Sequence, residues 1–158
     1  KQALINENFK VDTTEDIIGV QIASALKNII AIFAGLLDGL EQGDNSKAYV
    51  ITKGLEEIKN LGVKLGAKEE TFYGLAGIGD IIVTSMSKHS RNRFVGEQLG
   101  KGRKLNEIVE EMNMVAEGVN TIKSAIKLAE RENINLPLIK SLSDVLFNGK
   151  DPKEVLNF

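Results

Sequence analysis

Lys27 is the residue whose surroundings most suggest chemistry, because it lies within the otherwise apolar stretch ASALKNIIAIFAGLL. At helical spacing it belongs to a stripe of small or polar residues: Ser24, Lys27, Asn28, Ala31, Gly35 and Asp38. Small residues on one helix face allow close approach by another backbone or by a ligand. A lysine partly withdrawn from water on such a stripe can take part in proton transfer. The alternative is a lysine whose stem packs on the helix while its ammonium reaches water.

Asp80 is a second candidate, because it ends the glycine-rich segment 74–80, GLAGIGD. A carboxylate at this point could orient an ammonium group, and it could equally cap a helix. The three glycines predict a turn or a tight helix entry. They lack the strand-turn-helix context of a dinucleotide fingerprint, so we do not interpret them as one.

The run Ser90-Arg91-Asn92-Arg93 is the best candidate for an anion site. Ser90 is a typical N-cap for a helix over 91–99, and the free N–H groups of a helix start attract anions. A guanidinium and a carboxamide beside them suit the several hydrogen bonds that phosphate accepts. Segment 84–104 carries six basic residues and one acidic residue, about +5, so the rest of the chain sums to about −7 in a total of −2. An exposed basic helix end that binds nothing is the alternative.

Two further residues lie near these candidates. Glu117 follows Ala116 and precedes Gly118, where it either borders a ligand or serves as a first-turn acid stabilised by the helix dipole. His89 adjoins the basic segment. A lone histidine is more often incidental than catalytic.

The composition of the 158 residues excludes several classes of site. With no cysteine there is no disulfide scaffold, thiolate metal site or cysteine nucleophile. A single histidine argues against a multi-histidine metal site and a histidine-paired serine triad. No tryptophan, 5% aromatic residues and a net negative charge argue against a nucleic-acid partner. We therefore expect no metal.

The elements that must position these residues are about eight helices with almost no strand, so the expected fold class is all-α. A helix from about residue 17 to 40 presents one apolar face, and a second helix ends near Gly66. Shorter helices are expected over 105–112 and 117–131, and Pro137 and Pro152 are placed where helices can begin. Residues 1–15 predict an edge strand or a linker. The apolar face of the first helix is Ile18, Ile22, Leu26, Ile29, Phe33, Leu36 and Leu40.

The first helix is too mixed for a membrane span, since polar residues interrupt it, and the polar start has no signal-peptide core. We expect a cytoplasmic protein.

Four ordered motifs then carry a family resemblance. They are Gly19-Val20-Gln21 leading to Ala25-Leu26-Lys27-Asn28, the segment ending at Asp80, Ser90-Arg91-Asn92-Arg93 with Gly96, and Val115-Ala116-Glu117-Gly118. Together they resemble the bacterial NAD(P)-dependent glycerol-3-phosphate dehydrogenases. The resemblance covers the substrate-binding C-terminal domain, which has an all-helical fold of the 6-phosphogluconate dehydrogenase C-terminal type, from about residue 16 nearly to the end.

The resemblance implies a role for each matching residue. Lys27 would exchange the proton at the substrate C2 oxygen, with Asp80 beside it. Ser90, Arg91 and Asn92 would hold the glycerol phosphate. Arg91, Val115 and Glu117 would border NAD or NADP, which carries out the hydride step. Asn28, which adjoins the lysine in sequence, would belong to the same site.

The resemblance also implies what this chain lacks. The family's N-terminal Rossmann domain is absent, residues 1–15 resemble its end, and residues 16–158 form the substrate domain. We therefore expect the chain alone to be inactive and the full-length parent to be a homodimer that supplies glycerol 3-phosphate for glycerophospholipid synthesis. Two alternatives remain open: the substrate domain of another NAD(P)-dependent hydroxy-acid or phosphosugar dehydrogenase, and a non-catalytic helical binding module. The residues that select NADH or NADPH lie in the missing domain.

Overall fold

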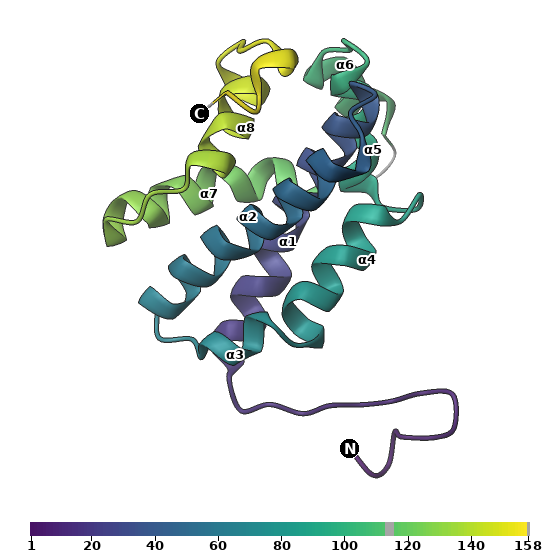
Figure 1. The fold of residues 1–158 in the computed structure, drawn as a ribbon, viewed down its shortest axis with the longest axis vertical. Coiled ribbons are helices and arrows are strands. Elements are labelled where there is room, and N and C mark those ends of the chain that lie inside the picture. The colour runs from purple at the N-terminus through teal and green to yellow at the C-terminus, as the bar shows by residue number, and fades with distance from the viewer. Residues whose placement is uncertain (113–115, 158) are drawn as a thin grey trace.

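The computed structural model describes residues 1–112 and 116–157, and over these ranges every regular element is helical (Figure 1). The all-α prediction is therefore confirmed. Within these ranges the chain forms eight α-helices, one π-helical turn, η1, and one 3-10 turn, η2. In chain order they are α1 (Ile17–Gly39), α2 (Asp44–Lys64), α3 (Glu69–Phe72), η1 (Leu75–Gly79), α4 (Asp80–Met86), α5 (Arg91–Gly100), α6 (Leu105–Glu111), α7 (Glu117–Glu132), α8 (Pro137–Phe147) and η2 (Pro152–Glu154).

Helix α1 is the central element, with α2, α4, α5 and α7 packed around it (Figure 1). From the sequence we expected the polar residues along this helix to exclude a membrane span. By length and hydropathy the helix could nevertheless cross a membrane, so those residues do not by themselves exclude one. In the fold, 56% of its most apolar window is buried. Its apolar surface is used for the core. Ile18, expected on that core face, is instead 43% exposed.

Helices α1 and α5 cross at the small residues of the predicted stripe. A Cβ atom at Gly35 would overlap the carbonyl oxygen of Arg93, and one at Gly96 would overlap the carbonyl oxygen of Ile32. Two glycines four residues apart on each helix, Gly35 and Gly39 on α1 and Gly96 and Gly100 on α5, let the two backbones touch. The small residues thus serve close approach by another helix.

Residues 1–15 form an exposed tail that leads away from the helices (Figure 1). The tail contains turns and no strand, so the edge-strand prediction is wrong, while a linker role for these residues stays a prediction. The tail joins the helices at Asp16, whose Oδ1 accepts a hydrogen bond from the Gly19 N–H at 2.9 Å and so caps α1. Its Oδ2 accepts bonds from the Lys68 N–H at 2.9 Å and the Thr71 hydroxyl at 2.6 Å. Asp16 thereby ties the start of α1 to the start of α3.

The pH dependence of stability should report the Asp16 contacts. The hydrogen bond from Thr71, then that from Gly19, holds the pKa of the Asp16 carboxyl below its ordinary value of 3.8. A lowered folded-state pKa contributes stability above the unfolded-state value, and this contribution is lost as the pH falls through the lowered one. Asp16→Asn should unfold at a lower temperature than the wild type at pH 7, and the difference should shrink below about pH 3.8. Thermal unfolding of both proteins across that range measures it, and a difference independent of pH would contradict the assignment.

Both prolines begin helical elements, as predicted. The free N–H groups at the start of α8 find their acceptor on a residue that is distant in sequence. Glu57 on α2 accepts hydrogen bonds from the N–H groups of Leu138 and Ile139, at 2.7 and 3.1 Å. Burial raises the pKa of Glu57 despite these bonds. No local pattern in the sequence pairs residues this far apart.

Candidate active site

Lys27 and Asp80 form an ion pair at the surface of the core, with 2.6 Å between Nζ and Oδ2. The lysine side chain is 19% exposed and the aspartate side chain 31% exposed. The other carboxylate oxygen, Oδ1, accepts a hydrogen bond from the Thr84 hydroxyl at 3.3 Å. The carboxylate is therefore held from two sides, and it fixes the direction in which the ammonium points.

The glycine-rich segment places Asp80 within reach of Lys27. Residues Leu75–Gly79 form a π-helical turn that runs directly into α4, so the predicted tight helix entry is confirmed. Gly77 must be a glycine, because a Cβ atom there would overlap the backbone of Phe72. Asp80 is the first residue of α4 and follows the N-cap position, which Gly79 occupies. Its carboxylate faces α1 and is available to the lysine.

A pocket of about 300 Å³ lies beside this pair, between α1, α4 and the start of α5. The pair reaches it through Thr84, which bonds to Asp80, and through Asn28, which follows Lys27 in α1. The lining thus combines one hydroxyl-bearing helix face with a basic helix start. It consists of Asn28, Val83, Thr84, Ser87, His89, Ser90, Arg91 and Asn92.

Ser90 caps α5 as predicted, since its Oγ accepts a hydrogen bond from the Arg93 N–H at 3.2 Å. The hydroxyl hydrogen is not used by that bond. Arg91 is the first residue of α5 and lines the pocket. Asn92 is buried, and its carboxamide contacts both Asn28 and the backbone of Gly118. The structure therefore brings Ser90, Arg91 and Asn92 together on the wall of one pocket.

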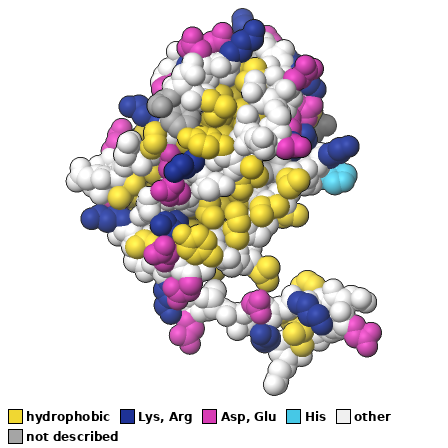
Figure 2. Space-filling view, viewed as in Figure 1, with side chains coloured by type: hydrophobic (Ala, Val, Ile, Leu, Met, Phe, Trp, Pro, Cys, Tyr) yellow, Lys and Arg dark blue, Asp and Glu magenta, His cyan; other side chains and the backbone are white. Residues whose placement is uncertain are grey.

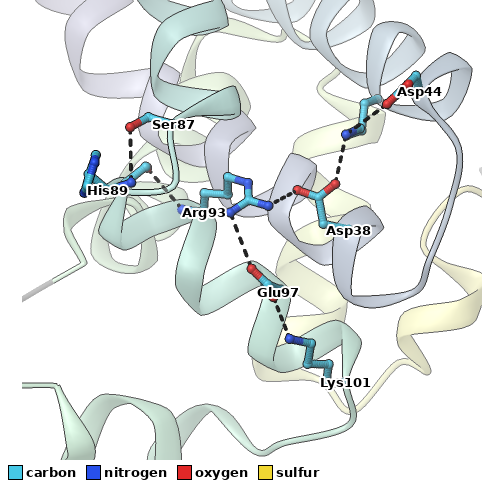
Figure 3. A network of polar contacts seen from close by, with 9 residues as sticks. Asp38, Asp44, Ser87, His89, Arg93, Glu97 and Lys101 are labelled. Carbon is cyan, nitrogen blue, oxygen red and sulfur yellow. Dashed lines mark hydrogen bonds and ion pairs between the residues drawn. The ribbon is translucent and has the colours of Figure 1, made fainter.

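Arg93 does not belong to this group. Its guanidinium pairs with Asp38 at 2.6 Å and with Glu97 at 3.4 Å, on the side of α5 that faces the end of α1 (Figure 3). Asp38 also pairs with Lys47 of α2, so the network joins three helices. The basic run predicted from the sequence therefore divides: its last arginine holds helices together.

The remaining candidates are Glu117, Val115 and His89. Glu117 is exposed at the first position of α7, next to Gly118, which bonds to Asn92. Val115 lies outside the described residues. His89 lines the pocket but is exposed, projecting at the edge of the molecule in cyan in Figure 2, and its backbone N–H bonds to the Ser87 hydroxyl.

Thr84 and Gly118 were missed by sequence reasoning. A signal for Thr84 exists, because it lies four residues after Asp80 and so on the same face of α4. For Gly118 no local signal exists, because its partner Asn92 comes from another helix.

A family model described as the NAD-dependent glycerol-3-phosphate dehydrogenase C-terminus matches residues 16–157. The chain belongs to this family, as its C-terminal domain. Two relatives are named glycerol-3-phosphate dehydrogenase [NAD(P)+]. The one from Bacillus subtilis is 55% identical over 92% of the chain, and the one from Fusobacterium nucleatum is 50% identical over 97% of it. The family resemblance inferred from the motifs is thus confirmed.

Solved glycerol-3-phosphate dehydrogenase structures share the fold. The enzyme from Coxiella burnetii superposes with a TM-score of 0.93 at 35% identity, and covers 99% of this chain and 48% of its own. The enzyme from Saccharomyces cerevisiae superposes with a TM-score of 0.88 at 28% identity, covering 97% and 45%. The chain spans 42% and 46% of the B. subtilis and F. nucleatum relatives, slightly less than half of their length.

Proposed function

We propose that this domain forms the substrate half of an enzyme that interconverts dihydroxyacetone phosphate and sn-glycerol 3-phosphate with NAD(P). The observation that carries the proposal is the Lys27–Asp80 pair at 2.6 Å, joined through Thr84 to the pocket that Arg91 lines. A proton-transfer group and an anion-binding helix start adjoin, as a small phosphorylated ketone requires.

Lys27 carries the proton in this proposal. When C2 of dihydroxyacetone phosphate gains a hydride, its carbonyl oxygen gains charge and takes the proton from Nζ; in the reverse direction Nζ takes it back. The ammonium also stabilises the charge as it develops on that oxygen. Asp80 holds Nζ in one direction, and Thr84 in turn holds Asp80.

The phosphate lies at the start of α5 in this proposal. The helix start supplies free N–H groups, Arg91 supplies a guanidinium and Ser90 a hydroxyl donor. Asn92 has one amide hydrogen and one carbonyl lone pair beyond those it uses within the protein, and the hydrogen is available to a phosphate oxygen.

The nicotinamide cofactor supplies or accepts the hydride when bound. Glu117 at the start of α7 and Arg91 at the start of α5 fit as its neighbours, because a hydrogen bond from Gly118 to Asn92 holds the two helix starts together. These residues form one edge of a cofactor site, and the remainder of that site belongs to the N-terminal half found in the relatives. We expect the domain alone to show no turnover, and a homodimeric, cytoplasmic parent remains a prediction.

Arg91→Ala in the full-length parent tests the proposal. The KM for dihydroxyacetone phosphate should rise about 10- to 100-fold, since a hydrogen bond to a charged group contributes about 1.5–3 kcal/mol. Steady-state kinetics with NADH or NADPH measures it. Arg131→Ala is the matched control, because that arginine is 68% exposed at the far end of α7, and its KM should not change.

The same measurement separates the alternatives. A wild-type parent that reduces another phosphosugar or a hydroxy-acid precursor in preference to dihydroxyacetone phosphate would place the domain in a related dehydrogenase. A wild type without any nicotinamide-dependent turnover would favour a binding module.

A further inference from the structure

The carboxamide of Asn92 is used at both ends inside the protein. Its Nδ2 donates a hydrogen bond to Asn28 Oδ1 at 3.0 Å, and its Oδ1 accepts one from the Gly118 N–H at 3.0 Å. Asn92 is 8% exposed and Asn28 is 7% exposed. These two hydrogen bonds, which we call the amide bridge of Asn28, Asn92 and Gly118, join α1, α5 and α7.

One backbone group fixes the direction of the whole amide bridge. A backbone N–H can only donate, so the Asn92 atom that faces Gly118 must be the carbonyl oxygen. The Asn92 nitrogen then faces Asn28, which must present its own oxygen. The N–H groups of a helix's first turn have no acceptor within the helix, and Asn92 supplies the acceptor for the N–H group of Gly118.

The start of α7 is also in direct contact with α1 beside the amide bridge. A Cβ atom at Gly118 would lie 2.7 Å from the carbonyl oxygen of Asn28 and 2.8 Å from Cδ1 of Ile32. The start of α7 therefore rests against the backbone of α1, and the amide bridge holds it there.

Each member of the amide bridge is next in sequence to a residue of the proposed site. Asn28 follows Lys27, Asn92 follows Arg91, and Gly118 follows Glu117. We propose that the amide bridge is a positioning device that sets the proton-transfer lysine, the phosphate-binding helix start and the cofactor edge relative to one another. Asn28 is then a positioning residue, which acts through Asn92. The inference rests on the proposed function.

Hydrogen exchange tests the mechanical part in the full-length parent, without turnover. Asn28→Ala removes the acceptor that orients Asn92, so the Gly118 amide should exchange at least about tenfold faster, by residue-resolved measurement. Ser141→Ala is the matched control, because it removes a buried hydrogen bond in α8, from Ser141 Oγ to the Val155 carbonyl, and should leave the Gly118 rate unchanged. An unchanged Gly118 rate in a folded Asn28→Ala protein would overturn the proposal.

Kinetics tests the coupling between the two sides of the site. Asn28→Ala should raise KM for both dihydroxyacetone phosphate and the nicotinamide cofactor about three- to tenfold, whereas Ser141→Ala should lower only the unfolding temperature. Asn28→Ala combined with Asn92→Ala should be no worse than Asn92→Ala, because the first change acts through Asn92. A rise confined to the phosphorylated substrate, or additive effects, would overturn the proposal in favour of an independent contact. A wild type without turnover contradicts the proposed function instead, and the exchange experiment still decides whether the amide bridge positions α7.

Discussion

Lys27→Ala in the full-length parent should lower kcat about 10²- to 10⁴-fold, the range that general acid–base groups contribute. The lysine Nζ lies 2.6 Å from Asp80 Oδ2. Among the ion pairs of the described residues, Lys27 is the lysine that pairs with Asp80. In the proposed mechanism its loss removes both the proton donor and the charge that stabilises the oxygen at C2. The KM for dihydroxyacetone phosphate should change less than kcat, because the phosphate contacts at α5 remain.

Two further variants make the Lys27 result specific. Lys127→Ala removes an exposed lysine of α7 and should leave kcat unchanged. Asp80→Asn should lower kcat as well, by a smaller factor, because the lysine remains but loses the carboxylate that directs it. Steady-state kinetics with thermal unfolding as a check on folding measures all three, and near-normal kcat in folded Lys27→Ala would rule out the proton-transfer role.

Gly96→Ala should destabilise the fold by about 2 kcal/mol, although alanine is the better helix former. Helix propensity alone favours alanine over glycine by about 1 kcal/mol. The added methyl group would overlap the Ile32 carbonyl oxygen and lie 2.7 Å from the Leu36 nitrogen, so α1 and α5 must separate. Overpacking of rigid backbone in a core typically costs about 1–3 kcal/mol and occasionally more. The steric cost therefore exceeds the gain in helix propensity, and the substitution lowers the stability of the fold.

Thermal unfolding measures this change as a drop of about 4–8 °C in Tm for a chain of this size. Gly43→Ala is the control, because a Cβ atom there meets nothing within 4 Å and its φ of −70° suits alanine. It should shift the stability by less than about 1 kcal/mol. A stabilised Gly96→Ala protein would show that the helices do not pack as closely as the glycine pairs indicate.

Local sequence determined most of the helices. The apolar periodicity predicted the bounds of α1 and the end of α2 to within a few residues, Ser90 caps α5 as expected, and both prolines begin an element. These features depend on residues within one or two turns of each other. For the same reason the motifs around Lys27, Asp80 and Arg91 could be recognised as a set.

The ambiguous short segments needed the tertiary structure. The short apolar run 81–84 does not by its pattern distinguish helix from strand. In the structure it belongs to α4, with Ile81 buried in the core. Residues Leu75–Gly79 form the tight helix entry that the glycines predicted, and the structure adds that Gly77 rests against the backbone of Phe72.

The sequence by itself determined the helices, the family and the residue types available for chemistry. Only the tertiary structure decided how those residues are used. In the fold Arg93 pairs with Asp38, whereas Arg91 lines the pocket, although both belong to one basic run. The fold also pairs Lys27 with Asp80, which lie 53 positions apart. The reason is physical: a helix sets the direction of each side chain, but the partner in that direction is set by how helices cross, and the crossing depends on glycine contacts between distant segments.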